Sequence, residues 1–370
     1  MRYIAKDIPL WQVTIWDKKF NNVDKKWQPK TIKYKYLLSD ELDSLRVDDG
    51  DVRILYTGKD VGFTTEELAG DRLSEGEIIS IPWGGIPTVK YHKGKFVTGD
   101  NRIATSKDIN KLTNKYLYYF MRGNIHEIAS YYRGASLKHP CMKDILKMTI
   151  SYPSVQEQDK ICGQFDVLEQ IIEVRKQELQ LLDDLIKARF VEMFNLSDCI
   201  YKSLGECTDF VDYRGHTPEL SDEGIIRMVN AKSVGKGFFK YVDEFVTEET
   251  YDAWMHRGFG YPGDILFVTE GHTFGNTCLI PEDMTKFALG QRVITIKGKE
   301  EIKNAFLCSY MQTDMFWKDI NVYRTGGTAQ GIRSKDLVKV MVPIPPIEQQ
   351  IEFVRFVHKV DKSKVVEIIN

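Results

Sequence analysis

The sequence predicts an α+β fold, in which two similar globular domains with twisted sheets are separated by long coiled-coil-like helices. The first observation behind this prediction is a repeat: Gly76-Glu77-Ile78 returns as Gly263-Asp264-Ile265, and Lys143-Asp144 returns as Lys335-Asp336. Solenoid repeats have periods of only about 20 to 50 residues, so an offset of roughly 190 indicates a duplicated domain. The second observation is that each copy ends in a helical pattern.

The composition is that of an ordinary folded protein. The chain has 370 residues, of which 42% are hydrophobic and 28% are charged, as in typical globular domains. No apolar run approaches the roughly 18 residues that cross a bilayer, and the first residues lack the apolar core of a signal peptide. The six cysteines form no Cys-x-x-Cys pair, which predicts neither zinc nor disulfides. We therefore expect a cytoplasmic protein with no membrane partner.

Charge is nearly balanced over the chain but clustered locally. A formal net charge of −2 argues against a protein that simply coats nucleic acid. Residues 131–147 nevertheless hold four Lys or Arg against one Asp, and the repeat partner, residues 323–339, again holds four against one. Either cluster alone could be scattered surface charge, but recurrence in both copies favours a shared anionic ligand.

Each copy starts with short strand-like runs bounded by Gly, Pro and Asp, with helical stretches between them. Strands and helices do not alternate regularly, which favours an antiparallel or mixed sheet over a parallel one. We also expect Arg102 and Arg292 to be equivalent. The predicted strands are 52–56, 77–81, 102–105, 225–229, 265–269 and 292–296, the predicted helices are 114–121 and 304–311, and the predicted domains are 1–152 and 196–344.

Long helices are predicted at 153–195 and 345–370. The first carries an apolar heptad seam over about 57 Å, which must pack against another helix. The second is shorter, so we expect it to cover about half of the first, and the remainder to need a partner in this chain or another. An ordinary linker helix is the alternative. The seam is Phe165, Ile172, Leu179, Ile186 and Met193 with Ile161, Leu168 and Leu182, and its counterpart holds Phe353, Val357 and Val360.

The loop 323–332 is the leading ligand candidate, and 132–139 is its counterpart. Its glycines allow close backbone approach, its arginines can contact phosphate or guanine, and Gln330 can pair with adenine. A tight turn before Lys335 is the alternative. The candidate DNA-binding residues are Arg324, Thr325, Gly326, Gly327, Thr328, Gln330, Arg333, Lys335, Arg214, His216, Thr217, His272, Tyr132, Arg133, Ser136, Lys138 and Lys143.

Motifs of catalysis are not found in the sequence. There is no glycine-rich cofactor loop after a strand, no Asn-Pro-Pro-aromatic turn, no Walker lysine motif and no His-Glu-x-x-His. Asp264 and Glu270 could imitate nuclease carboxylates, but no lysine follows Glu270. We therefore expect a recognition device with no catalytic residues, no metal and no cofactor in this chain.

With these parts in order, the chain resembles the specificity subunit of type I restriction-modification systems over nearly its whole length. The most specific mark is the proline-rich helix entry at residues 343–350, and the first copy keeps a similar entry at 153–158. Residues 83–85 and 136–139 depart from the usual pattern of the family. The other marks are Arg214-Gly215-His216-Thr217-Pro218, Gly263-Asp264-Ile265-Leu266 and the Gly-Gly-Thr-Ala-Gln loop at 326–330.

The resemblance implies two target recognition domains, each reading one half of a split double-stranded DNA site. It implies that the conserved helices set the unread gap and dock two modification subunits, which methylate adenine N6. Motor-nuclease subunits can join to form the restriction complex, and S-adenosylmethionine and Mg-ATP would belong to these partner subunits. Family members usually have two conserved helices of similar length, so we expect the shorter second helix to be compensated by self-association or by a partner subunit.

Two other functions stay open on the sequence. One is a self-contained DNA-modifying or DNA-cleaving enzyme with an unrecognised active site, and the other is a helical scaffold with no nucleic-acid role. The bases read and the length of the gap cannot be predicted, because side-chain identity alone does not give the docked position.

Overall fold

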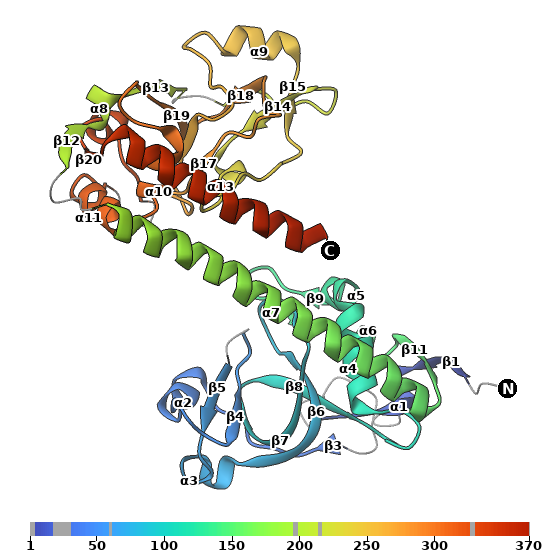
Figure 1. Cartoon of the computed structure of the whole chain (residues 1–370). Coiled ribbons are helices and arrows are strands. Elements are labelled where there is room, and N and C mark those ends of the chain that lie inside the picture. Colours follow the sequence, from blue (N-terminus) through green and yellow to red (C-terminus); the bar gives the residue numbers. More distant parts are fainter. Residues whose placement is uncertain are drawn as a thin grey trace. The chain divides into compact units, whose positions relative to one another are not determined.

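The computed structural model describes residues 4–17, 31–58, 61–194, 199–213, 217–325 and 330–369. The chain divides into two compact units, Met1–Val174 and Arg175–Asn370, which are described separately (Figure 1). The division falls inside the long helix α7 (Val155–Met193), so the predicted domain limits stay predictions.

The first unit is built on a mixed seven-stranded sheet (Figure 1). Most neighbouring strands are antiparallel, whereas β2 with β3 and β4 with β7 are parallel. The expectation of a mixed sheet is confirmed. The spatial order is β3 (Thr31–Ile32), β2 (Thr14–Asp17), β8 (Asn101–Ser106), β6 (Ser74–Pro82), β7 (Lys90–Thr98), β4 (Val52–Leu55) and β5 (Val61–Thr64).

The second unit repeats this order in two smaller sheets. In place of the single strand β7 it has two strands, β17 and β18, of which β18 runs parallel to β14 as β7 runs parallel to β4. The first sheet is β13 (Thr208–Asp212), β19 (Val293–Gly298), β16 (Ile265–Val268) and β17 (Thr277–Leu279), and the second is β15 (Phe245–Val246), β14 (Ile226–Val229) and β18 (Phe287–Leu289).

The strand register corrects one predicted equivalence. Arg102 lies opposite Ile81 in the first sheet, whereas Val293 lies opposite Val268 in the second. Arg102 therefore corresponds to Val293, and the match with Arg292 is wrong by one position. Loops of different length precede the two strands, and a sequence offset alone cannot place such an insertion.

In each repeat the first strand pairs with the last strand before the long helix. In the first unit β1 (Ile4–Pro9) pairs with β11 (Thr149–Pro153), and in the second β12 (Ile200–Ser203) pairs with β20 (Met341–Ile344), both antiparallel. The short helices are α1 (Leu10–Val13), α2 (Ser39–Ser44), α3 (Glu66–Ala69), α4 (Asn114–Gly123), α5 (Ile125–Ser130), α6 (Met142–Ile145), α8 (Leu204–Cys207), α9 (Glu248–Trp254), α10 (Asn304–Tyr310), α11 (Asp314–Val322) and α12 (Ser334–Leu337).

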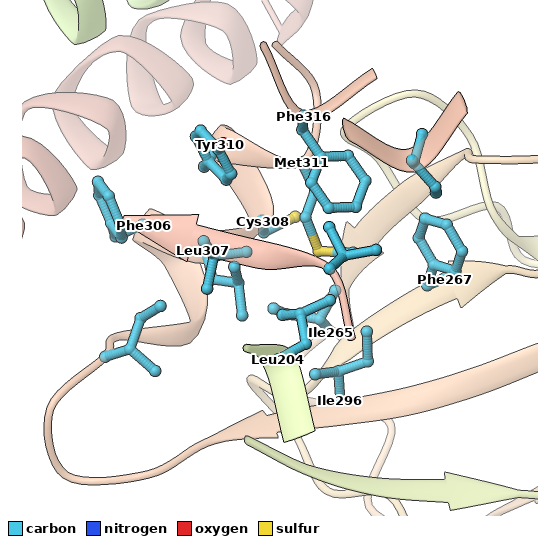
Figure 2. Close-up of a cluster of buried hydrophobic side chains, with 14 of the residues drawn as sticks. Leu204, Ile265, Phe267, Ile296, Phe306, Leu307, Cys308, Tyr310, Met311 and Phe316 are labelled. Carbon is cyan, nitrogen blue, oxygen red and sulfur yellow. The ribbon is translucent and has the colours of Figure 1, made fainter. Parts of the chain in front are cut away.

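Each unit has its own apolar core. In the second unit, Figure 2 shows one cluster of buried side chains that runs from Phe306 and Leu307 of α10 to Phe316 of α11 and Phe267 of β16. Burial of such large aromatic side chains is the dominant favourable contribution to folding. In the first unit Trp16 and Leu117 belong to the corresponding core. The two helices and six strands expected in these regions are confirmed, with ends that shift by a few residues.

The long helix is confirmed, but its seam is only partly covered. Near its end, Phe190 and Phe194 pack against Phe353 of α13 (Ile347–Ile369), with ring centroids 5.4 and 5.5 Å apart. The seam residues Phe165, Leu168 and Ile172 are exposed, so this part of the seam needs the further partner that the sequence predicts. Among the described residues, no helix combines the length and apolar character needed to cross a membrane.

A buried glutamine joins the start of α7 to the first repeat. The Gln158 amide group donates to the carbonyl oxygens of Lys111 at 2.7 Å and Pro153 at 2.8 Å. Its own oxygen accepts a hydrogen bond from the backbone N–H of Thr113, the residue that caps α4, at 2.9 Å. One side chain therefore ties the helix entry, the preceding loop and α4 together.

Gln350 makes the same three bonds in the second unit. Its amide group donates to the carbonyls of Glu301 at 3.0 Å and Pro345 at 2.8 Å. Its oxygen accepts from the backbone N–H of Lys303, which caps α10, at 2.9 Å. Neither glutamine is exposed to solvent. These two residues fix how each long helix leaves its repeat, and buried amides without partners would be unfavourable.

Candidate nucleic-acid interface

The second unit holds the predicted glycine loop between two backbone hydrogen bonds. The N–H of Thr325 donates to the carbonyl of Gly331 at 2.8 Å, and the N–H of Gly331 donates to the carbonyl of Thr325 at 3.0 Å. A Cβ on Gly331 would lie 2.9 Å from the Cβ of Glu270, so only glycine fits where the two segments meet. Gly326, Gly327 and Thr328 lie outside the described residues.

A second loop, after β16, joins this one. The N–H of Gly271 donates to the carbonyl of Gln330 at 2.9 Å, and the N–H of Ile332 donates to the carbonyl of Thr269 at 2.9 Å. His272 and Gln330 were predicted from separate stretches of sequence, and the structure brings their backbones together with both side chains exposed.

The first unit builds the same frame. β9 (Tyr132–Arg133) pairs with β10 (His139–Pro140), and the loop between them holds Ser136 and Lys138, which are exposed. The N–H of Gly85 donates to the carbonyl of Lys138 at 3.3 Å, just as Gly271 donates to Gln330. Each repeat therefore presents two joined loops, one after β6 or β16 and one before α6 or α12.

Tyr132 has a different place from the one predicted. It is only 5% exposed, and its hydroxyl donates to the carbonyl of Pro82 at 2.8 Å. Burial raises the pKa of this hydroxyl, so it stays protonated. The residue therefore holds the loop against β6 instead of presenting a group to a ligand.

His139 replaces a backbone hydrogen bond that the first unit cannot form. Pro140 stands where the second unit has Ile332, and proline has no N–H to donate. In the first unit the His139 Nδ1 instead donates to the carbonyl of Trp83, one residue beyond the position that corresponds to Thr269, at 2.7 Å. The first copy therefore differs from the second in sequence here. A side-chain hydrogen bond from His139 joins its two loops where the second copy uses a backbone hydrogen bond.

The side chains of Trp83 and Arg102 pack together next to the two joined loops of the first unit. The Arg102 guanidinium carbon lies 4.8 Å from the centre of the Trp83 ring, and the His139 ring lies 5.3 Å from it. Arg102 is 1% exposed and donates to the Asp17 carboxylate at 2.9 Å. Burial, followed by the charge of Asp17, raises the pKa of the Tyr34 hydroxyl. Arg102 therefore supports Trp83 from a buried position, and its guanidinium group is not available to contact DNA.

Exposed cations surround both pairs of loops. Arg133 bonds to Asp144 at 2.6 Å, and Arg324 bonds to Asn321 at 3.2 Å, so these two are oriented by neighbours. Lys143 in α6 and Lys335 in α12 occupy equivalent positions. The side chains of Lys138, Lys143, Arg333 and Lys335 are exposed. Thr217 is also exposed, whereas Arg214 and His216 lie outside the described residues.

Sequence comparison identifies what these loops belong to. The sequence profile described as type I restriction modification DNA specificity domain matches residues 42–183 and 209–370, one match for each repeat. The chain belongs to this family. Its members are DNA-binding specificity subunits, and the resemblance predicted from the sequence is confirmed.

Two Escherichia coli relatives are specificity subunits of type I restriction enzymes. The chain is 21% identical over 309 residues to the type I restriction enzyme EcoDI specificity subunit, covering 74% of this chain and 68% of that protein. It is 24% identical over 280 residues to the EcoR124I/EcoR124II specificity subunit, covering 70% of this chain and 66% of that protein. The alignments therefore span about two thirds of each relative.

A solved structure shares the fold. The crystal structure of the type I restriction-modification S subunit from M. genitalium superposes with a TM-score of 0.57 and 17% identity, covering 99% of this chain and 91% of that one.

Within the described ranges, no group of three or more His, Cys, Asp or Glu side chains could hold a metal ion.

Replacing Gln330 by alanine in this specificity subunit is expected to weaken recognition of one half-site only. A lost bidentate contact with adenine corresponds to about 1 to 3 kcal/mol. The measurement is the dissociation constant for duplexes in which each half-site is altered in turn. Lys138→Ala, at the equivalent position of the first unit, should affect the other half-site, and equal losses at both halves would show that Gln330 acts structurally.

Replacing Lys335 by alanine is expected to weaken binding to all sequences alike. Its ammonium group is exposed at the start of α12, where it can neutralise one phosphate, and each phosphate contact releases counterions. The slope of log affinity against log salt concentration should fall by about 1. Lys143→Ala should do the same, and a loss confined to one DNA sequence would contradict the assignment.

Proposed function

We propose that this chain reads a bipartite DNA site, one half with each repeat, and docks adenine-N6 methyltransferase subunits without any catalysis of its own. The observation that carries the proposal is the duplicated frame: the Gly85–Lys138 bond recurs as Gly271–Gln330, with exposed cations beside both. Two readers in one chain suit two separate half-sites, and different side chains on the same frame suit different bases.

The long helix supports an unread gap between the half-sites. Its 39 residues span roughly 59 Å at about 1.5 Å per residue. Half-sites one turn of DNA apart are separated by about 34 to 36 Å, so a rigid element of this length is long enough to separate two readers. Gln158 and Gln350 make each helix entry rigid, which a fixed gap requires.

Exposed apolar residues on α7 support partner subunits. Phe165, Leu168 and Ile172 lie on one heptad seam and remain exposed in this chain, and a seam of this kind is stable when another helix covers it. We infer that methyltransferase subunits cover it, and that S-adenosylmethionine, and Mg-ATP where motor-nuclease subunits join, are bound by the partners.

The test is methyl transfer by purified components. The chain is co-expressed with its modification subunits, and incorporation of labelled methyl groups into DNA is compared among the complex, the modification subunits alone and the chain alone. The proposal expects N6-methyladenine at specific sites only with the complex. Equal methylation by the modification subunits alone would overturn it, and turnover by the chain alone with S-adenosylmethionine or Mg²⁺ would indicate a self-contained enzyme.

A further inference from the structure

Two large exposed apolar side chains flank the hydrogen bond that joins the two loops of the first unit. Ile86 is 75% exposed and Leu137 is 54% exposed. They come from different loops, which the Gly85–Lys138 hydrogen bond holds together. A Cβ on Gly84 would lie 3.3 Å from the Leu137 Cγ and Cδ2, so the leucine side chain rests on the backbone of the other loop. Single exposed apolar residues are ordinary, but an apolar pair in a binding loop indicates a contact surface.

This apolar pair is held in place before any ligand binds. Gly85 has a φ of 89°, and a Cβ on Gly134 would lie 2.2 Å from the Leu137 carbonyl oxygen. Both positions therefore require glycine. The Trp83 ring beside them contacts both Arg102 and His139. Loops ordered in advance lose little conformational entropy on binding.

The charges around the pair indicate its occupant. Arg133, Lys138 and Lys143 are exposed nearby in the sequence, so the surface combines an apolar tip with cations. Double-stranded DNA matches both features, because phosphates lie beside grooves in which the C5-methyl of thymine is the one apolar group on a major-groove base edge. In the second unit the residues that follow the Gly271 hydrogen bond are His272 and Thr273, and Gln330 takes the place of Lys138, so the same frame there offers polar groups.

We propose that Ile86 and Leu137 recognise thymine through its C5-methyl group, which makes the first unit a reader of thymine in its half-site. This inference rests on the proposed function and specifies the chemistry of one half-site. It adds two residues that the sequence pattern alone did not single out.

The test replaces thymine by uracil, which removes only the methyl group. A split duplex is first selected from a random library on the full chain, then synthesised with uracil in one half-site or the other, and binding is measured by titration. We expect uracil in one half-site to weaken binding about fourfold for each contacted methyl, the factor that burial of one methyl-sized group produces, and uracil in the other half-site to have a smaller effect.

The variants assign the effect to this pair. In Ile86→Ala/Leu137→Ala the difference between thymine and uracil should disappear, and in the matched control His272→Ala it should persist. Both replaced side chains are exposed, so the double variant should keep its fold. The comparison of thymine DNA with uracil DNA on the unaltered chain does not depend on any variant. Equal binding of both DNAs in either half-site, or an unchanged difference in the double variant, would overturn the inference. Failure to select any split duplex would instead count against the proposed function.

Discussion

Replacing Gln350 by alanine is expected to lower the free energy of unfolding of the second unit by about 3 kcal/mol. The change removes three hydrogen bonds of the buried Gln350 and leaves the Lys303 N–H and the carbonyls of Glu301 and Pro345 without this partner in a partly buried place. A buried polar group left unsatisfied destabilises a protein by roughly 1 to 3 kcal/mol. Urea unfolding followed by circular dichroism measures the loss.

The neighbouring glutamine supplies the control. Gln349 is exposed, so Gln349→Ala should leave the unfolding midpoint nearly unchanged, although it changes the same amino-acid type at the next position. Gln158→Ala and Gln156→Ala form the corresponding pair in the first unit, where Gln158 is buried and Gln156 is exposed. Similar midpoints for Gln350→Ala and Gln349→Ala would contradict the role given to the buried side chain.

Replacing Asp17 by alanine is expected to destabilise the first unit by about 3 to 5 kcal/mol. Asp17 accepts from the Arg102 guanidinium and from the Ile103 N–H, each at 2.9 Å, and both ion-pair partners are buried. Removing Asp17 leaves the buried Arg102 guanidinium to its second carboxylate partner, the more exposed Asp100, and this loss is more unfavourable than breaking an exposed ion pair. The measurement is the free energy of unfolding of the variant.

The exposed ion pair of Lys35 and Asp71 is the matched control. Asp71→Ala should change the stability within experimental error, because exposed pairs are screened by solvent. Asp17→Ala should also reduce the DNA affinity of the first unit, since Arg102 supports Trp83 beneath the loops. A variant as stable as Asp71→Ala would show that Arg102 is held by other contacts.

The long helix and the duplication could be predicted because they depend on local and repeated patterns. Proline-free heptads specify a helix without knowledge of the rest of the fold, and the Lys143-Asp144 and Lys335-Asp336 pairs occupy equivalent turns. The burial of the seam could not be predicted in the same way. Apolar spacing requires a partner somewhere, but it does not say whether that partner lies in the same chain, and Phe165 is exposed here.

Individual residues of the candidate site were predicted from the sequence, but the way in which their loops come together was not. Gln330 and His272 were both identified, but their loops are joined by backbone hydrogen bonds, such as that from Gly271 to Gln330, between segments that are far apart in the chain. In sequence Arg102 was identified only as the expected counterpart of Arg292, and the structure shows that it is buried against Asp17. The one available signal for the loop of Ile86 was the adjacent pair Gly84-Gly85, which indicates close backbone approach.

The buried glutamines illustrate the same limit. In sequence, Gln158 and Gln350 stand in a proline-rich helix entry, where a polar residue near the first turn is common. Their side chains instead reach backbone groups of residues more than forty positions earlier. That contact is tertiary, so the recurrence of glutamine in both copies was the only sign of it.

The most direct test is to map N6-methyladenine in the DNA of cells that carry this chain together with its modification subunits. Two readers held by rigid helix entries predict one split motif, with two specific halves and an unread gap of constant length, which is absent when the gene for this chain is deleted. A contiguous motif, a gap of variable length or a motif that persists after the deletion would contradict the account.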